Sequence, residues 1–285
     1  MGDGDDYEQA LMRLLPRITD RDRRILVGLW EHRVMTTHHL HRIFFPHAGG
    51  RRARYRLLVL HRYGLIDRFR RHTHDRNAPD HWVLAPTGAA LVALHRGEDP
   101  LPLGRHRHDR ALALAYAPNL PHILGLAETR AALYEAAREA GAEVVRWVGE
   151  RESARRWNDY AVRPDAHLRW RQHGRTLDAF LEYDTGTENL NQVQWKMPGY
   201  RRLAEATGRP VVVLFLFHSQ QREDNAARKL AEYCTGTLGV YMSTYTRLYT
   251  LGAAEPIWRL AHCRDRAPLG EISLAYPQQV RRQME

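Results

Sequence analysis

The chain has 285 residues, 44% of them hydrophobic and seven of them tryptophan, which excludes a disordered protein and suggests two compact domains or one large one. Its formal net charge of +10 favours a polyanionic partner, although an arginine-rich product of a GC-rich coding sequence is the alternative explanation. Two cysteines are too few for a disulfide framework or a cysteine zinc site.

The sequence shows no signal for export or membrane insertion. Residues 1–8 are acidic and lack an apolar core, so no signal peptide is expected. The longest apolar run, 210–217, has the length of a strand and not of a membrane span. We therefore expect a cytoplasmic protein that does not contact a membrane.

Residues 1–96 are predicted to form a winged helix-turn-helix domain. Apolar residues at helical spacing predict three helices, at 20–32, 38–45 and 51–63. A hairpin with strands at 65–70 and 81–84 follows, and Pro86 begins a closing helix. In such domains the third helix enters the major groove of DNA, while the hairpin, or wing, reaches the phosphates.

Basic side chains concentrate on the third helix and the wing of this domain. Residues 1–110 carry 20 arginines against 13 carboxylates. The candidate DNA contacts are Arg51, Arg52, Arg54 and Arg56 on the helix and Arg68, Arg70 and Arg71 on the wing. We expect them to bind the backbone of double-stranded DNA. The alternative is a winged helix that contacts proteins, with its arginines solvated.

Residues 97–120 are predicted to be a linker, because they combine prolines with a short basic run. His106, His108 and Asp109 in this segment resemble a set of metal ligands. Since 17 histidines are spread along the chain, chance clustering is the simpler explanation.

Residues 121–285 are predicted to form an αβββαβ domain with a mixed sheet. The expected elements are a helix at 122–140, strands at 143–148, 163–170 and 177–183, a helical stretch at 188–206 and a buried strand at 210–217. A further helix at 226–233 and a strand at 238–242 follow. The whole chain is thus predicted to belong to the α+β or α/β class.

Carboxylates gather where two of these strands approach each other. Residues two apart in a strand share a face, so Asp178, Glu182 and Asp184 are expected to point the same way. Hairpin pairing brings Asp165 close to Glu182. These two carboxylates and the backbone carbonyl of Tyr183 suit Mg²⁺ or Mn²⁺, with Asp184 as a further candidate ligand.

A lysine follows this acidic segment, although the chain has only two lysines among 43 basic side chains. Lys196 is expected to stabilise the negative charge that develops on a phosphate during hydrolysis. On a helix, Lys196 and Tyr200 lie on one face. The predicted catalytic residues are therefore Asp165, Glu182 and Lys196. Glu128, on the first helix of this domain, either completes the metal shell or is an ordinary solvated carboxylate.

These residues carry a resemblance to two families. Residues 163–200 resemble the PD-(D/E)XK nuclease superfamily, which implies a restriction-endonuclease-like fold and the catalytic set named above. The longer stretch from Ile18 to Tyr200 is similar to the replication-relaxation family of actinobacterial plasmids and integrative elements. This second similarity rests on the winged helix, on residues 180–188, and on Lys196 with Tyr200.

Two features depart from the nuclease pattern. Asp184 stands two residues after Glu182, where the superfamily usually has its lysine, so Lys196 has to reach in from the following helix. Pro198 and Gly199 follow that lysine directly, and a proline there removes a helical hydrogen bond and favours a kink.

The leading hypothesis is a metal-dependent DNA endonuclease or nickase that acts in plasmid or mobile-element replication or transfer. Replication or transfer proteins are possible partners, and a homodimer is plausible. The competing hypothesis is a non-catalytic DNA-binding accessory factor with a degenerate nuclease fold, its acids and lysine held in ordinary ion pairs. A covalent relaxase would need a tyrosine nucleophile, such as Tyr183 or Tyr200, with a histidine-rich metal site, and no histidine triad has that spacing.

Overall fold

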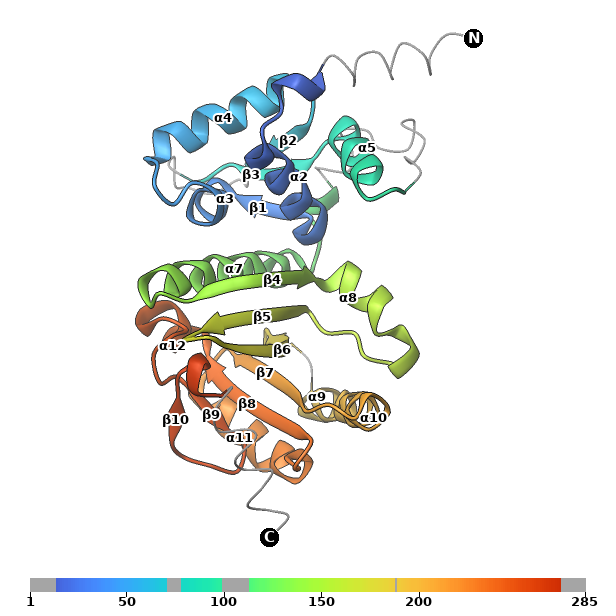
Figure 1. Ribbon diagram of the computed structural model, residues 1–285, viewed down its shortest axis with the longest axis vertical. Coiled ribbons are helices and arrows are strands. Elements are labelled where there is room, and N and C mark those ends of the chain that lie inside the picture. The colour runs from blue at the N-terminus through green and yellow to red at the C-terminus, as the bar shows by residue number, and fades with distance from the viewer. Residues whose placement is uncertain (1–13, 71–77, 99–112, 188, 273–285) are drawn as a thin grey trace. The chain divides into compact units, whose positions relative to one another are not determined.

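The computed structural model describes residues 14–70, 78–98, 113–187 and 189–272 (Figure 1). The chain divides into two compact units, Met1–Ala127 and Glu128–Glu285. The boundary falls inside helix α7 (Leu120–Glu139), a few residues beyond the predicted linker. Most of that linker, including His106, His108 and Asp109, lies outside the described residues.

The first unit is built from short helices around a three-stranded antiparallel sheet with strand order β1-β3-β2. Its elements are η1 (Leu15–Arg17), α2 (Asp20–His32), β1 (Val34–Thr36), α3 (Thr37–Phe44), α4 (Gly50–Arg62), β2 (Ile66–Phe69), β3 (His81–Leu84) and α5 (Pro86–His95). Each predicted helix and strand is present within one or two residues of its expected bounds. Strand β1 was not predicted, because three residues are too few to show an alternating pattern.

Local hydrogen bonds set the starts of two of these helices. Thr19 and Asp22 form a reciprocal capping box at the start of α2, and Thr36 forms another with His39 at the start of α3. The apolar faces that follow are buried around Trp82, which is 0% exposed and donates its indole N–H to Thr37 Oγ1 at 2.8 Å. The capping residues and the apolar spacing therefore indicate the same helix bounds for α2 and α3.

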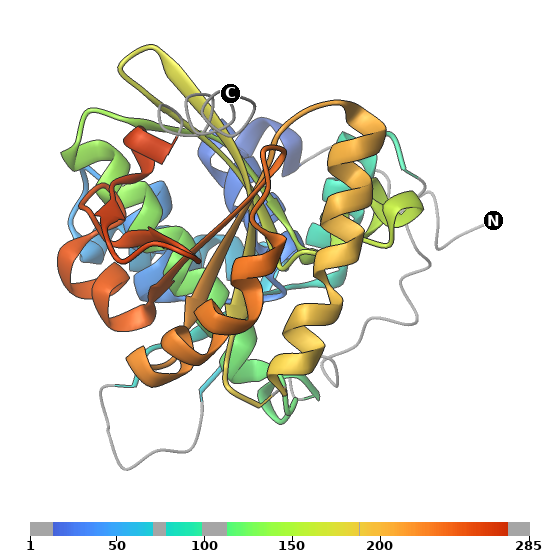
Figure 2. The same ribbon diagram turned by 90° about the horizontal axis from the view of Figure 1, so that it is seen from below.

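The second unit is a seven-stranded mixed sheet with helices on both faces (Figure 2). After α7 its elements are β4 (Glu143–Gly149), α8 (Glu150–Arg156), η3 (Asn158–Tyr160), β5 (Ala166–Gln172), β6 (Arg175–Asp184), α9 (Leu190–Trp195), α10 (Met197–Thr207), β7 (Val211–Phe217), α11 (Gln220–Leu230), η4 (Ala231–Tyr233), β8 (Leu238–Thr244), α12 (Tyr245–Leu251), β9 (Trp258–Leu260) and β10 (Arg266–Ala267). The strand order is β10-β9-β8-β7-β6-β5-β4. Strands β4, β5 and β6 are antiparallel, whereas β6, β7 and β8 are parallel.

The helices of this unit pack on the sheet in two layers. Helices α9, α10 and α11 share a core with the buried face of β7 and with Phe180 of β6. Helix α12 lies on the opposite face, where Tyr245 stacks on Tyr183 and Tyr249 contacts Thr129 of α7. Neighbouring side chains of β6 therefore point to different helical layers.

Several details of this unit differ from the sequence prediction. Helices α8 and α12 were not predicted, and α11 begins at Gln220, six residues before the helix expected at 226–233, because its first residues are polar. Strand β5 begins at Ala166, so Asp165 stands just before the strand and not within it. The helical stretch expected at 188–206 is two helices that meet at Lys196. The sheet also continues beyond β8 into β9 and β10, two short strands whose two or three residues carry too little pattern to predict.

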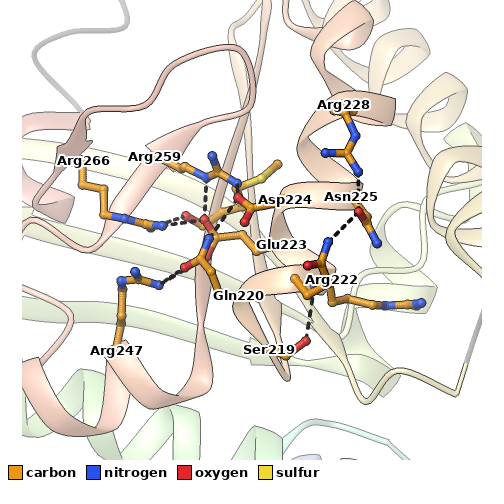
Figure 3. Close-up of polar contacts among 12 residues, drawn as sticks. Ser219, Gln220, Arg222, Glu223, Asp224, Asn225, Arg228, Arg247, Arg259 and Arg266 are labelled. Atoms are coloured by element: carbon orange, nitrogen blue, oxygen red, sulfur yellow. Dashed lines mark hydrogen bonds and ion pairs between the residues drawn. The ribbon is translucent and has the colours of Figure 1, made fainter.

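A buried carboxylate ties these last strands to helix α11 (Figure 3). Glu223 is 0% exposed, and its Oε1 accepts hydrogen bonds from Arg259 Nε at 2.5 Å and from Arg266 Nη2 at 2.6 Å. Arg247 Nη1 lies 3.7 Å from Oε2 of the same carboxylate. The three guanidinium groups compensate the buried charge, so this network joins α11, α12, β9 and β10.

No helix among the described residues is long and apolar enough to cross a membrane.

Candidate functional site

Three side chains, those of Asp165, Lys196 and Tyr200, converge on the buried carboxylate of Glu182. We call Asp165, Glu182, Lys196 and Tyr200 the acid–lysine cluster. Lys196 donates from Nζ to Glu182 Oε2 at 2.7 Å, and Tyr200 donates from its hydroxyl to Glu182 Oε1 at 2.5 Å. Asp165 lies beside them, and its Oδ2 accepts the backbone N–H of Tyr183 at 2.7 Å. The three predicted catalytic residues are thus brought together.

Strand register places the two acids of the cluster. Ala166 of β5 pairs with Leu181 of β6, so the residue before Ala166 lies opposite Glu182. The backbone N–H of Tyr183 then anchors the Asp165 carboxylate at the point where the β5–β6 pairing ends. The strand register and this hydrogen bond together place Asp165 and Glu182 next to each other.

A break between two helices places the lysine. Helix α9 ends at Trp195, and α10 starts at Met197 with Pro198 in its first turn, where a proline needs no hydrogen-bond partner for its nitrogen. Lys196 lies between the two helices, and its side chain is directed to Glu182. Tyr200, four residues later, reaches the same carboxylate as expected for one helical face.

Burial dominates the electrostatics of this cluster. Glu182 is 2% exposed, and burial raises the pKa of its carboxyl to about 7, while the ammonium of Lys196 lowers it and the charge of Asp165 raises it. Burial and the neighbouring Glu182 also raise the pKa of Tyr200 well above its usual range. Tyr200 consequently keeps its proton at neutral pH and donates a hydrogen bond to Glu182.

The donor set suits a small, hard cation that binds few protein ligands. Asp165 and Glu182 offer carboxylate oxygens, and Mg²⁺ is commonly held by one or two carboxylates with its remaining positions filled by water. Among the described residues no group of three or more His, Cys, Asp or Glu side chains is arranged to hold a metal. A cation held here would be bound by two carboxylates, one of which, Glu182, also accepts a hydrogen bond from Lys196.

The other candidate ligands lie in different surroundings. Asp184 is held by Arg222 of α11, with Nε at 2.6 Å and Nη2 at 3.0 Å from the two carboxylate oxygens. Asp178 is exposed and pairs with Arg169. Glu128 acts electrostatically on Tyr183 and Tyr249, whose side chains face the α12 layer. Arg222 was not anticipated, because it lies 38 residues from Asp184 along the chain.

The predicted DNA-contacting arginines of helix α4 fall into two groups. Arg51, Arg52 and Arg54 are exposed. Arg56 instead forms a two-pronged ion pair with Asp22 of α2, at 2.9 Å and 2.5 Å, and also donates to the backbone carbonyl of Arg17. This ion pair joins α4 to α2. Since Asp22 is 0% exposed, Arg56 neutralises a buried charge and supports the fold.

The wing arginines share one acid. Arg68 Nη1 lies 3.1 Å and Arg70 Nε 2.6 Å from the carboxylate oxygens of Asp80, while both guanidinium groups remain exposed to solvent. Arg71 lies outside the described residues. The positive charge of Arg68 and Arg70 is thus fixed in position but partly neutralised.

A stack of tyrosines lies on the far face of β6. The rings of Tyr183 and Tyr245 are parallel with centroids 4.4 Å apart, and Tyr249 stacks on Tyr245 at 6.3 Å. Burial raises the pKa of all three hydroxyls, which opposes formation of a phenolate. The spacing of Tyr245 and Tyr249, four residues apart on one helix, was the available sequence signal for this stack.

Comparison with family models places most of the chain in one family. The model described as replication-relaxation matches residues 26–213, which is more than half of the sequence. The chain belongs to the replication-relaxation family. No curated protein and no solved structure matches the sequence significantly.

The matched region of this replication-relaxation protein includes the whole acid–lysine cluster and ends within β7. Helix α11, strand β8 and the Glu223 network follow it. Family membership supports a role in replication or relaxation of plasmids and mobile elements.

Proposed function

We propose that this replication-relaxation protein binds double-stranded DNA and cleaves or nicks it at the acid–lysine cluster. The observation that carries the proposal is the convergence of Asp165, Glu182 and Lys196 from a strand end, a strand and a helix junction. The arrangement of β4 to β7, with three antiparallel strands and a fourth parallel one, supports the resemblance to PD-(D/E)XK nucleases. We place the reaction in plasmid or mobile-element replication or transfer.

The first unit supplies the duplex-binding surface in this proposal. Three helices followed by a two-stranded hairpin have the order of a winged helix-turn-helix, whose third helix is α4. Arg51, Arg52 and Arg54 are exposed on that helix and are suited to phosphate contacts. Arg68 and Arg70 carry the charge of the wing.

Each residue of the cluster has a distinct part in the proposed cleavage. Asp165 and Glu182 would hold Mg²⁺ or Mn²⁺, with the Tyr183 carbonyl as a further oxygen ligand. When bound, the metal supplies positive charge at the scissile phosphate and acidifies water. Lys196 donates hydrogen bonds from Nζ and stabilises negative charge on the phosphate. Tyr200 keeps Glu182 oriented through Oε1.

A non-catalytic DNA-binding factor is the second candidate. It is favoured by the bonding of Glu182, whose two oxygens both accept hydrogen bonds from protein side chains. A metal would have to share this carboxylate with Lys196. In that case the cluster would serve only to stabilise the fold.

Cleavage of supercoiled plasmid in Mg²⁺ or Mn²⁺ distinguishes the two candidates. We expect the native chain to produce nicked or linear DNA, and Asp165→Asn, Glu182→Gln and Lys196→Met to reduce the rate at least about 100-fold, as loss of a preorganised charge does in other enzymes. EDTA should abolish the reaction.

Two matched variants control for general effects. Lys229→Met removes the chain's other lysine, which is exposed and pairs with Asn191 away from the cluster. Glu205→Gln removes an exposed acid of α10, the helix that carries Tyr200. Equal cleavage by all five variants would trace the activity to a contaminant and leave the non-catalytic factor as the function.

A further inference from the structure

A second concave site lies on the same sheet face as the acid–lysine cluster. A pocket of about 600 Å³ opens between the starts of β6 and β7, the end of α10 and the end of α8. Four arginines line it: Arg146, Arg156, Arg169 and Arg209. We call it the arginine pocket. No step of the proposed cleavage uses it.

The pocket carries an excess of positive charge. Among the described lining residues the only carboxylate is Asp178, which pairs with Arg169 at 2.8 Å and 3.1 Å. Partial burial and the neighbouring charges of Arg156 and Arg169 lower the pKa of Arg146, although Glu152 and Asp178 oppose this. The guanidinium groups thus repel one another, and an anion bound among them would relieve that repulsion.

One wall of the pocket is aromatic and apolar. The ring of Trp157 lies with its centroid 4.9 Å from that of Phe180 and 5.0 Å from that of His167. Arg156 lies over the indole with its guanidinium carbon 5.7 Å from the ring centroid. Leu203 and Val211 extend this wall. A planar base can rest on such a surface, because aromatic and guanidinium planes stack on any nucleobase.

A buried histidine also lines the pocket. His167 is 8% exposed, and its Nε2 lies 3.5 Å from Oδ1 of Asp178. The imidazole ring therefore lies beside the Asp178–Arg169 pair.

We propose that the arginine pocket binds a phosphate-bearing nucleotide, with the phosphate held by the arginines and the base against Trp157. Arginine suits this ligand because its guanidinium forms paired hydrogen bonds to phosphate oxygens. The nucleotide is either free or part of a DNA strand. Asp178, at the pocket, and Glu182 are four residues apart on β6, about 13 Å at 3.3 Å per residue, or about four steps of B-DNA at 3.4 Å per step.

Calorimetric titration of the full chain in EDTA tests the proposal without any contribution from metal-dependent cleavage. The probes are dAMP, ribose 5-phosphate, inorganic phosphate, and one short oligonucleotide with either a 5′-phosphate or a 5′-hydroxyl. We expect saturable binding of dAMP, of a phosphorylated oligonucleotide, or of both, and weaker binding of ribose 5-phosphate and of inorganic phosphate. Binding of both nucleotide probes assigns the site to nucleotides in general, and binding of the oligonucleotide alone assigns it to a DNA strand.

Paired variants locate the binding. Arg146→Ala combined with Arg209→Ala should weaken binding about tenfold or more, and both side chains are exposed, so folding should persist and can be verified by circular dichroism. Arg171→Ala is the control, because Arg171 is an exposed arginine of β5 that pairs with Glu143 outside the pocket. Its affinity should match that of the native chain.

Three results would overturn the proposal. The first is the absence of saturable binding for every probe. The second is an equal loss of affinity in Arg171→Ala, which would indicate general attraction to a basic surface. The third is saturable binding of both dAMP and inorganic phosphate with equal affinity, which would leave an anion site without base recognition.

Discussion

At the scale of single residues, the second unit places two titratable side chains in buried positions on one sheet face. Glu182 is stabilised by Lys196 and Tyr200, and its pKa is raised to about 7. His167, two residues after Asp165, is buried beside Trp157 and has its pKa lowered to about 4. These opposite shifts follow from one cause, because burial penalises the charged form of an acid and of a base alike.

The stability of the native chain relative to a His167→Phe variant should depend on pH. The unfolded chain binds a proton at His167 near pH 6.5 and the folded chain only near pH 4, so the stabilisation is present above pH 6.5 and is lost as pH falls to about 4. The lost stability amounts to at most about 3 kcal/mol, at 1.36 kcal/mol per pKa unit. Urea unfolding of both chains at pH 7.5, 5.5 and 4.5 measures the difference.

The comparison with a variant is needed because the contribution of Glu182 to stability changes with pH in the opposite direction to that of His167. Its folded pKa lies above its ordinary value of 4.5, so its contribution to stability is largest below pH 4.5 and is lost as pH rises through about 7. Subtracting the His167→Phe curve cancels this effect, since Glu182 is present in both chains. A difference that stays constant across the three pH values would contradict a buried neutral histidine.

At the scale of elements, junctions between helices and strands decide where the functional side chains lie. Lys196 reaches Glu182 because two helices, and not one, follow β6. The first turn of α11 acts similarly, because Arg222 pairs with Asp184 at the end of β6. Glu223 of the same turn pairs with arginines of α12, β9 and β10 (Figure 3). This turn links the matched family region to the strands that follow it.

Glu223→Gln should destabilise the second unit strongly. The substitution leaves Arg259 and Arg266, only 11% and 17% exposed at their side chains, without their shared anion. Breaking a buried ion pair by removing one partner costs about 3–5 kcal/mol. Thermal unfolding followed by circular dichroism measures the effect. Asp20→Asn is the control, since Asp20 is 89% exposed in its pair with Arg23 and should change stability by less than about 1 kcal/mol. Similar values for both variants would show that the network contributes little.

At the scale of the whole molecule, the chain divides its charged side chains between holding the fold and facing solvent. In the first unit Arg56 pairs with Asp22, whereas Arg51, Arg52 and Arg54 of the same helix are exposed. In the second unit, the arginines of the Glu223 network hold the fold, whereas those of the arginine pocket face solvent. A net charge of +10 therefore overstates the charge available to a partner.

Alanine substitution should separate the two roles on helix α4. Arg51→Ala, Arg52→Ala and Arg54→Ala together should weaken duplex binding and lower the salt slope by about 0.9 for each DNA phosphate that is no longer neutralised, with little change in stability. Arg56→Ala should instead destabilise the first unit by about 3–5 kcal/mol, because Asp22 is left buried without its cation. Fluorescence anisotropy at several salt concentrations and urea unfolding measure the two quantities. Equal weakening of DNA binding by a surface change such as Arg228→Ala would contradict the assignment to α4.

Local patterns predicted most of the fold. Apolar spacing and capping residues are properties of a few neighbouring side chains, so α2, α3, α4, β6 and β7 were recognisable from short stretches of sequence. The family was also recognisable, because its characteristic residues occur in order along the chain. Helices α8 and α12 were not predicted. Strands β1, β9 and β10 were not predicted either, since two or three residues show no alternating pattern, and β1 and β9 are held by partners distant in sequence.

The sequence by itself determined the order of the longer helices and strands, the family, and the expectation that Asp165, Glu182 and Lys196 act together. Only the tertiary structure decided how each charge is partnered: Tyr200 with Glu182, Arg222 with Asp184, Arg56 with Asp22. The physical reason is the range of the interactions. Helices and strands are set by neighbours a few residues apart, whereas the buried ion pairs join residues 14 to 43 positions apart and depend on strand register and helix packing.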